Sequence, residues 1–266
     1  MDLQLVGRRA VVTGGSRGIG KAVALALARE GCAVGVAARD RDAVGAAARE
    51  IQDTTGTRAV PLVADTGDTA SVEEMVTGAV ELLGGVDILV NCAARPAGGA
   101  APPALEELPD ALFAEEMNTK VLGYLRCARA AAPHMKRAGW GRIISIAGLA
   151  ARQTGNTVGS IRNVAVVAMT RNLAEELGPH GINVTAVHPG LTYTERIPAL
   201  ARAAAEREGI SDEEATRRLL AGNALRRAIH ADDVAALVAF LASPLSVAVN
   251  GDVIAAGGGV GRSIYY

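Results

Sequence analysis

The chain has 266 residues, of which 50% are apolar and 21% are charged, and its formal net charge at pH 7 is −1. This composition is ordinary for a globular protein and supplies enough apolar material for a full core. The small net charge gives no electrostatic reason to expect nucleic acid or an anionic membrane as a partner. No signal-peptide pattern and no run of about 18 apolar residues occurs, so we expect a cytoplasmic protein without a membrane span. The three cysteines lack the spacing of a metal site, and none is predicted.

Short apolar runs rich in Val and Ile alternate with longer segments of helical period, a pattern typical of an α/β fold. The runs are continuously apolar, which favours a parallel sheet buried on both faces within a single domain spanning residues 1–266. The predicted strands are Arg9–Thr13, Ala33–Ala38, Ala59–Ala64, Asp87–Asn91, Arg142–Ile146, Asn183–His188 and Val253–Ala256. The predicted helices are Gly18–Glu30, Arg41–Gln52, Val72–Leu83, Ala111–Lys136, Asn156–Leu177 and Ala231–Leu241.

Two features refine this pattern. Ser71 and Ser211 are each followed three residues later by Glu, which predicts a capping box at the start of two helices. Residues 194–223 interrupt the alternation with a polar and Ala-rich excursion after the sixth strand. Since ligands bind beyond the carboxyl ends of such strands, we expect a lid over the site here. A surface helical hairpin without a ligand role is the alternative.

The first predicted strand runs into a glycine-rich loop that is followed at once by a helix. Residues 13–20 read Thr-Gly-Gly-Ser-Arg-Gly-Ile-Gly. Glycines allow a tight turn and let the backbone approach a pyrophosphate at the positive helix N-terminus. This placement, with a second strand about 20 residues later, predicts a dinucleotide site.

The end of the second strand distinguishes the two nicotinamide cofactors. It reads Ala37-Ala38-Arg39-Asp40, so a neutral residue and an arginine stand where an NAD site tends to carry an acidic residue. Arg39 and Arg17 can converge on a 2′-phosphate, which favours NADP(H) over NAD(H). Asp40 weakens this preference, because it can pair with Arg39 or turn toward a ribose.

Together these motifs resemble the short-chain dehydrogenase/reductase family, and the resemblance runs through nearly the whole chain. It implies a Rossmann-type doubly wound fold with a seven-stranded parallel sheet, helices on both faces and a small lid. Pro189-Gly190-Leu191-Thr192-Tyr193-Thr194 resembles the family segment that holds the nicotinamide, and Asn118 resembles its helix asparagine. The cofactor-binding residues implied are Gly14, Ser16, Arg17, Gly18, Ile19, Gly20, Arg39, Asp65, Asn91, Ala93, Asn163, Pro189, Gly190, Leu191 and Thr194.

The chain departs from the family where the catalytic residues belong. The resemblance places Gly148 at the family's serine, and Gly159 and Asn163 at its Tyr-x-x-x-Lys pair. No tyrosine of this chain stands four residues before a lysine. A glycine cannot act as the acid that protonates a developing alkoxide.

The sequence offers several replacement groups. Asn163 lies one helical turn after Gly159, where its amide can bind the nicotinamide ribose. Asn118 can hold a water, or it caps or packs a helix. Tyr193, His188 and Arg162 are further candidates, although His188 suits a structural role and Arg162 is expected to face solvent.

Three functions remain open. The first is an atypical NADP(H)-dependent oxidoreductase of a small carbonyl or alcohol, with a non-standard proton donor. The second is a lyase or isomerase on the same scaffold, and the third an inactive nucleotide-binding sensor or partner subunit. The resemblance also implies a homodimer or homotetramer, which the apolar stretches Ala128–Ala132 and Val164–Ala168 allow.

Overall fold

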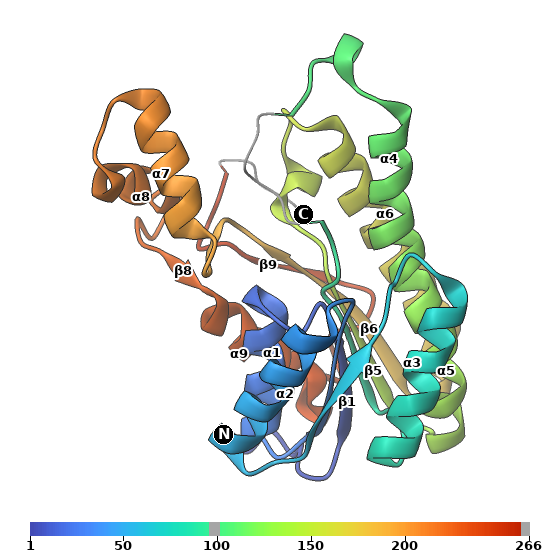
Figure 1. Ribbon diagram of the computed structural model, residues 1–266. Coiled ribbons are helices and arrows are strands. Elements are labelled where there is room, and N and C mark those ends of the chain that lie inside the picture. Colours follow the sequence, from blue (N-terminus) through green and yellow to red (C-terminus); the bar gives the residue numbers. More distant parts are fainter. Residues whose placement is uncertain (96–101, 262–266) are drawn as a thin grey trace.

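A seven-stranded parallel sheet forms the centre of the molecule (Figure 1). The computed structural model describes residues 1–95 and 102–261. The strand order is β3-β2-β1-β4-β5-β6-β9, and every neighbouring pair is parallel. The strands are β1 (Arg9–Thr13), β2 (Ala33–Ala38), β3 (Ala59–Val63), β4 (Ile88–Asn91), β5 (Gly141–Ile146), β6 (Ile182–Pro189) and β9 (Val253–Ala256). The predicted fold class is therefore confirmed.

Helices cover both faces of this sheet. One apolar core joins the sheet to α1 (Gly18–Arg29), α2 (Arg41–Thr55) and α9 (Ala231–Ala242). A second core joins the opposite face to α3 (Thr69–Leu83), α5 (Gly123–Ala138) and α6 (Thr157–Leu177). Figure 1 shows these two layers on either side of the strands. Burial on both sides explains why the strands are continuous apolar runs.

The helix predicted over Ala111–Lys136 contains an irregularity. It consists of α4 (Asp110–Glu116), a π-helical segment Met117–Leu122 and α5, without a break in helical backbone angles between them. A π-helical turn shifts the side chains after it relative to a regular α-helix. The side chains of α5 are therefore shifted relative to those of α4, compared with one continuous α-helix.

One predicted helix start is wrong and another is confirmed. α3 begins at Thr69, because the Asp68 side chain accepts a hydrogen bond from the Ser71 backbone N–H at 2.7 Å. The Ser71 hydroxyl instead accepts from the backbone N–H of Asp65 at 3.0 Å. The helix start predicted at Ser211 is confirmed, because the Ser211 hydroxyl caps α8 (Asp212–Leu220) by accepting a hydrogen bond from the N–H of Glu214.

The excursion after β6 folds into a helical hairpin. β7 (Thr192–Tyr193) pairs with β8 (Ile229–His230), and α7 (Ile197–Glu208) packs against α8 above this pair. The hairpin has a small core of its own, made of Ala201, Ala204, Ala205 and Ala215. In Figure 1 it projects beyond the carboxyl ends of the strands. Among the described helices, none is long and apolar enough to cross a membrane.

Candidate dinucleotide and catalytic site

The loops that carry the predicted site all follow carboxyl ends of strands. The strand order reverses between β1 and β4, and such a switch point is where doubly wound sheets bind ligands. The glycine-rich loop follows β1, and residues 91–93 lie at the end of β4 and directly after it. Gly148 follows β5, and the segment 189–194 follows β6. The predicted residues of these loops therefore gather at one edge of the sheet.

Gly14, Gly15 and Gly20 are packed so tightly that the loop has no room for a side chain at these positions. A Cβ atom on Gly20 would lie 2.2 Å from the carbonyl oxygen of Gly14. Gly14 has a φ of +65°, and a Cβ there would lie 2.9 Å from the backbone nitrogen of Ala93. α1 begins at Gly18, so its free N–H groups and positive dipole end lie at this loop. This geometry suits a pyrophosphate.

Two arginines are exposed next to this loop. Arg17 is the residue before α1, and Arg39 follows β2. The loop and β2 meet directly, because the Gly15 N–H donates to the carbonyl of Ala37 at 3.1 Å. The Asp40 carboxylate caps α2, accepting from the N–H groups of Asp42 and Ala43 at 3.0 Å each. Asp40 is therefore engaged with its own helix.

The nicotinamide segment approaches the glycine loop from the other side. The Thr194 methyl lies 3.7 Å from the position that a Cβ of Gly18 would occupy. Gly190 packs against the end of β9, where a Cβ would lie 3.0 Å from the Cα of Gly257. Pro189 is buried and Leu191 is exposed. The two predicted binding segments thus face each other.

Other predicted cofactor residues lie around the same edge. Asp65 is exposed after β3 and accepts from the Gly67 N–H at 2.8 Å. Asn91 is fully buried at the end of β4, and its amide makes no hydrogen bond within the described part of the chain. Ser16, Ile19 and Ala93 are half-buried.

The two glycines that the family resemblance places at the catalytic positions both lie near Asn163. The Gly148 N–H donates to Nδ1 of His188 at 3.0 Å, and a Cβ on Gly148 would lie 3.2 Å from Nδ2 of Asn163. Gly159 lies in the first turn of α6, where its N–H donates to the capping Asn156. Nδ2 of Asn163 donates to the Gly159 carbonyl at 2.8 Å. Gly148, Gly159 and Asn163 therefore lie together in the fold.

A lysine that the sequence did not single out completes this group. Nζ of Lys120 donates to Oδ1 of Asn163 at 2.8 Å and to the carbonyl of Ala147 at 2.7 Å. Only 4% of Lys120 is exposed. Burial lowers the pKa of its ammonium from 10.5 to about 7, although Cys92 acts in the opposite direction. One sequence signal pointed to it, because Lys120 stands on the helix stripe shared by the buried Tyr124 and Cys127.

Asn118 stands two residues before Lys120, but its side chain points to the loop after β3 and not to Asn163. Its Nδ2 donates to the carbonyl of Gly67 at 3.2 Å, in the loop after β3. Its own carbonyl accepts from the guanidinium of Arg126, which also contacts the Thr66 carbonyl. The helix residue that contacts Asn163 is therefore Lys120.

The remaining acid candidates have partners of their own. Burial and the charges of Arg152 and Lys120 lower the pKa of His188 to about 4, so its ring is neutral and accepts from Gly148. The Tyr193 ring packs on His230 with centroids 5.1 Å apart. Arg162 was predicted to face solvent, and this prediction is wrong, because the residue is 8% exposed and paired with Glu116 of α4.

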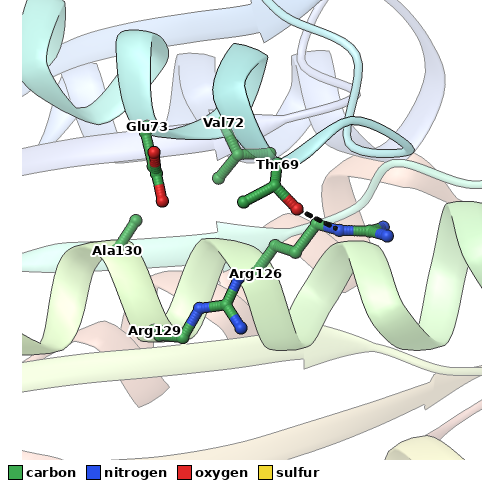
Figure 2. A pocket seen from close by; sticks show the side chains of 6 residues that line it. All are labelled: Thr69, Val72, Glu73, Arg126, Arg129 and Ala130. Atoms are coloured by element: carbon green, nitrogen blue, oxygen red, sulfur yellow. Dashed lines mark hydrogen bonds between the residues drawn. The ribbon is translucent and has the colours of Figure 1, made fainter.

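Among the hollows of the described structure, two are lined by polar and apolar side chains from separate elements. One of about 200 Å³ lies between the loop after β5 and the segment after β9. Its lining includes Leu149, Arg152, Gln153 and Val260. The other, of about 190 Å³, lies between α3 and α5 and is shown in Figure 2. There Arg126 donates to the Thr69 hydroxyl at 3.1 Å, beside Glu73 and Arg129. Within residues 1–95 and 102–261, no cluster of three or more metal-ligating side chains is found.

Comparison with known proteins agrees with this geometry. Residues 14–261 match the family described as Enoyl-(Acyl carrier protein) reductase. The chain therefore belongs to the short-chain dehydrogenase/reductase family of oxidoreductases.

Individual relatives match over nearly their full length. Short-chain reductase protein NovJ of Streptomyces niveus is 36% identical over 252 residues, which covers 94% of this chain and 92% of that protein. L-rhamnose 1-dehydrogenase (NAD(P)(+)) of Azotobacter vinelandii is 33% identical, covering 96% and 97%. The crystal structure of L-sorbose reductase from Gluconobacter frateurii, complexed with NADPH and L-sorbose, matches with a TM-score of 0.92 at 26% identity, covering 99% and 100%.

Proposed function

We propose that this protein is an NADP(H)-dependent oxidoreductase that acts on a small carbonyl or alcohol substrate with a non-standard proton donor. The observation that carries the proposal is the glycine loop, which has no room for side chains at Gly14, Gly15 and Gly20 and faces the nicotinamide segment. A protein that only clamped a nucleotide would not need that second segment. The L-sorbose reductase complex with NADPH and L-sorbose supports the same substrate class.

The preference for NADP(H) rests on the exposed arginines. Arg17 and Arg39 flank the meeting point of the loop and β2, and Asp40 is held by the first turn of α2. A 2′-phosphate would pair with guanidinium groups there, whereas an acidic residue would repel it. NADPH-dependent reductase BacG of Bacillus subtilis, 28% identical over 260 residues, supports this preference.

Three groups of residues would bind the adenine half of the cofactor, its nicotinamide half and the substrate. N–H groups at the start of α1 would hold the pyrophosphate, and Asp65 would contact the adenine side. The segment 189–194 and Asn163 would orient the nicotinamide and its ribose, and a bound NADPH would supply the hydride. The hollow lined by Leu149, Arg152 and Gln153 would receive the substrate. The roles of Asn118 and of the hairpin as a lid remain predictions.

The association of subunits is also part of the proposal. We propose a homodimer or homotetramer formed through α5 and α6. The predicted stretch on α5 points largely inward, since Ala128 and Ala131 are at most 2% exposed, whereas the stretch on α6 has Val166 buried but Val164 and Ala168 exposed. A patch made of Leu122, Leu125, Ile161 and Val164 supports the contact instead, because each is between 37% and 50% exposed.

Titration calorimetry and a turnover assay test the function. We expect NADPH to bind more tightly than NADH, and Arg39→Ala to weaken NADPH binding by about tenfold or more, because charged hydrogen bonds contribute roughly 1.5–3 kcal/mol. NADH binding should not change. Arg58→Ala is the matched control, since Arg58 is exposed at the amino end of β3.

A panel of small ketones, aldehydes and alcohols completes the test. Substrate-dependent loss of NADPH absorbance is the expected result. Product formation without a change in cofactor redox state would identify a lyase or isomerase. Tight cofactor binding without turnover would identify a sensor or partner subunit. Failure to bind either dinucleotide would contradict all three.

A further inference from the structure

Lys120 is a buried cation without a carboxylate partner in the described structure. Its ammonium contacts two neutral oxygens, those of Ala147 and Asn163, and no Asp or Glu of residues 1–95 or 102–261 lies within 4.0 Å of it. Buried charges are normally paired, because their desolvation costs several kcal/mol when they are not. An unpaired amine in such a place therefore calls for an explanation by function.

Its position in the fold connects it to the site. Lys120 belongs to the π-helical segment, and such segments occur frequently at functional sites. The π-helical segment contacts α6, and the lysine reaches the Asn163 side chain. Asn163 in turn adjoins Gly148 and Gly159, the two positions without side chains. An ammonium carries three N–H donors, of which these contacts engage two.

The groups packed around Lys120 are unsuited to supplying a proton at neutral pH. Burial raises the pKa of the Cys92 thiol, after β4, to about 12. Burial raises the pKa of Tyr124, on α5, well above its usual range, and its hydroxyl donates to the Ile146 carbonyl. His188, at the end of β6, is neutral because its pKa is lowered to about 4. On the α4 and α6 side, Glu116 and Arg162 pair with each other.

We infer that Lys120 is the proton source of this site, an inference that rests on the proposed oxidoreductase function. In the reduction of a carbonyl, hydride from NADPH forms the new C–H bond, and the carbonyl π pair moves to oxygen. An N–H bond of the Lys120 ammonium breaks, and its proton reaches that oxygen through one water. The products are the alcohol, NADP⁺ and a neutral amine, which solvent reprotonates. Asn163 is the positioning residue that orients Nζ.

The first arm of the test needs no turnover. The chain has three lysines, Lys21, Lys120 and Lys136, so protein labelled with [13Cε]lysine gives three resolvable signals. Lys120→Met assigns the signal of interest. We expect that signal to titrate with a midpoint near 7 and to move when NADP⁺ is added. A midpoint near the ordinary lysine value of about 10.4 would overturn the inference.

The second arm measures NADPH oxidation with a substrate from the ketone panel. For the wild type we expect kcat to fall as pH rises through the midpoint of the Lys120 signal, because the charged amine is the donor. Lys120→Met should lower kcat about 100-fold or more and remove this pH dependence, since a positioned acid contributes roughly 10²- to 10⁴-fold. NADPH affinity should stay within about threefold, because a proton donor acts in the transition state and not in cofactor binding. Lys136→Met, at the exposed end of α5, is the matched control.

The outcomes separate this inference from the proposed function. If Lys120→Met keeps the wild-type rate and pH profile, Lys120 is not the proton source, and the oxidoreductase function stands. If the wild type binds NADPH but oxidises it with no substrate, the proposed function fails and the inference with it. If Lys120→Met does not fold, the wild type alone supplies the test. The pH at which its kcat falls to half must then coincide with the titration midpoint of the lysine signal that moves with NADP⁺. A mismatch between the two midpoints overturns the inference.

Discussion

At the scale of single residues, the candidate catalytic centre is a set of short backbone and side-chain contacts. Gly148 donates its N–H to His188, Asn163 contacts the Gly159 carbonyl, and Lys120 contacts Asn163. These contacts join the loop after β5, the end of β6, α6 and the π-helical segment. A substitution at any one of these residues is therefore expected to change the positions of the others.

The burial of Lys120 predicts a pH-dependent stability. Its pKa in the folded protein is about 7, below the ordinary value of 10.5, so the unfolded chain binds more protons between these values. Lys120 therefore destabilises the fold most at and below about pH 7, and this penalty disappears as pH rises toward about 10. Relative to Lys120→Met, the wild type should gain up to about 1.4 kcal/mol of unfolding free energy per pH unit in that window.

Urea unfolding of both proteins across the window measures this slope. The hydrogen bonds lost in Lys120→Met add an offset that does not depend on pH, so the slope and not the offset is the test. Lys136→Met should run parallel to the wild type. Parallel curves for Lys120→Met would show that the lysine titrates normally.

Sequence alone located the glycines and Asn163 but not the role of Lys120. The resemblance to the family located Gly148, Gly159 and Asn163, because it fixes where each stands relative to β5 and α6. A regular helical period places Lys120 on the buried stripe of Tyr124 and Cys127, but it does not show that Nζ reaches Asn163, because that contact joins two helices distant in sequence. Arg162 was expected at the surface for a similar reason, since its partner Glu116 comes from a distant helix.

At the scale of elements, strands were predicted more closely than helix ends. β1, β2 and β9 have the predicted bounds. β1 and β2 are buried parallel strands, which read as apolar runs, and β9 is a short apolar run that ends before Gly257. The start of α3 was misplaced since both Asp68 and Ser71 are residues that cap helices, and only the fold shows which side chain faces the free N–H groups.

The hairpin of α7 and α8 predicts a cofactor-dependent change in hydrogen exchange. Its small core of alanines favours local opening, whereas Thr194 at its base lies against the glycine loop. If it is a lid, amides of residues 197–220 should exchange about 100-fold more slowly with NADPH at about 100 times its dissociation constant. Unchanged exchange there, with slower exchange in residues 14–20, would favour a surface hairpin without a ligand role.

At the scale of the whole molecule, the site is assembled from most of the chain. Its loops follow β1, β4, β5 and β6, and the end of β9 supports the segment after β6. The order of these strands could be predicted through the resemblance to a family, but not from apolar periodicity, which says nothing about which strands are neighbours. The hollow beside Arg152 could not be predicted, because two loops distant in sequence form it.

The exposed patch on α5 and α6 predicts how copies of the chain associate. In light scattering the wild type should have a mass that is two or four times the 27.1 kDa of one chain. Leu125→Glu with Val164→Glu should yield the single-chain mass, because two charges would be buried without partners. Leu82→Glu is the control, since Leu82 is 41% exposed on α3. A monomeric wild type would contradict the prediction.

The close approach of Gly190 to Gly257 has a consequence for engineering this protein. A Cβ on Gly190 would lie 3.0 Å from the Cα of Gly257, and a Cβ on Gly257 would lie 2.5 Å from Cδ1 of Leu149, so a side chain at either position would require its neighbours to shift. Natural or engineered changes in substrate specificity are then expected in the side chains that line the hollow, which include Leu149, Arg152, Gln153 and Val260. A library of variants restricted to these four positions would alter which substrates the hollow binds and leave Gly190 and Gly257 unchanged.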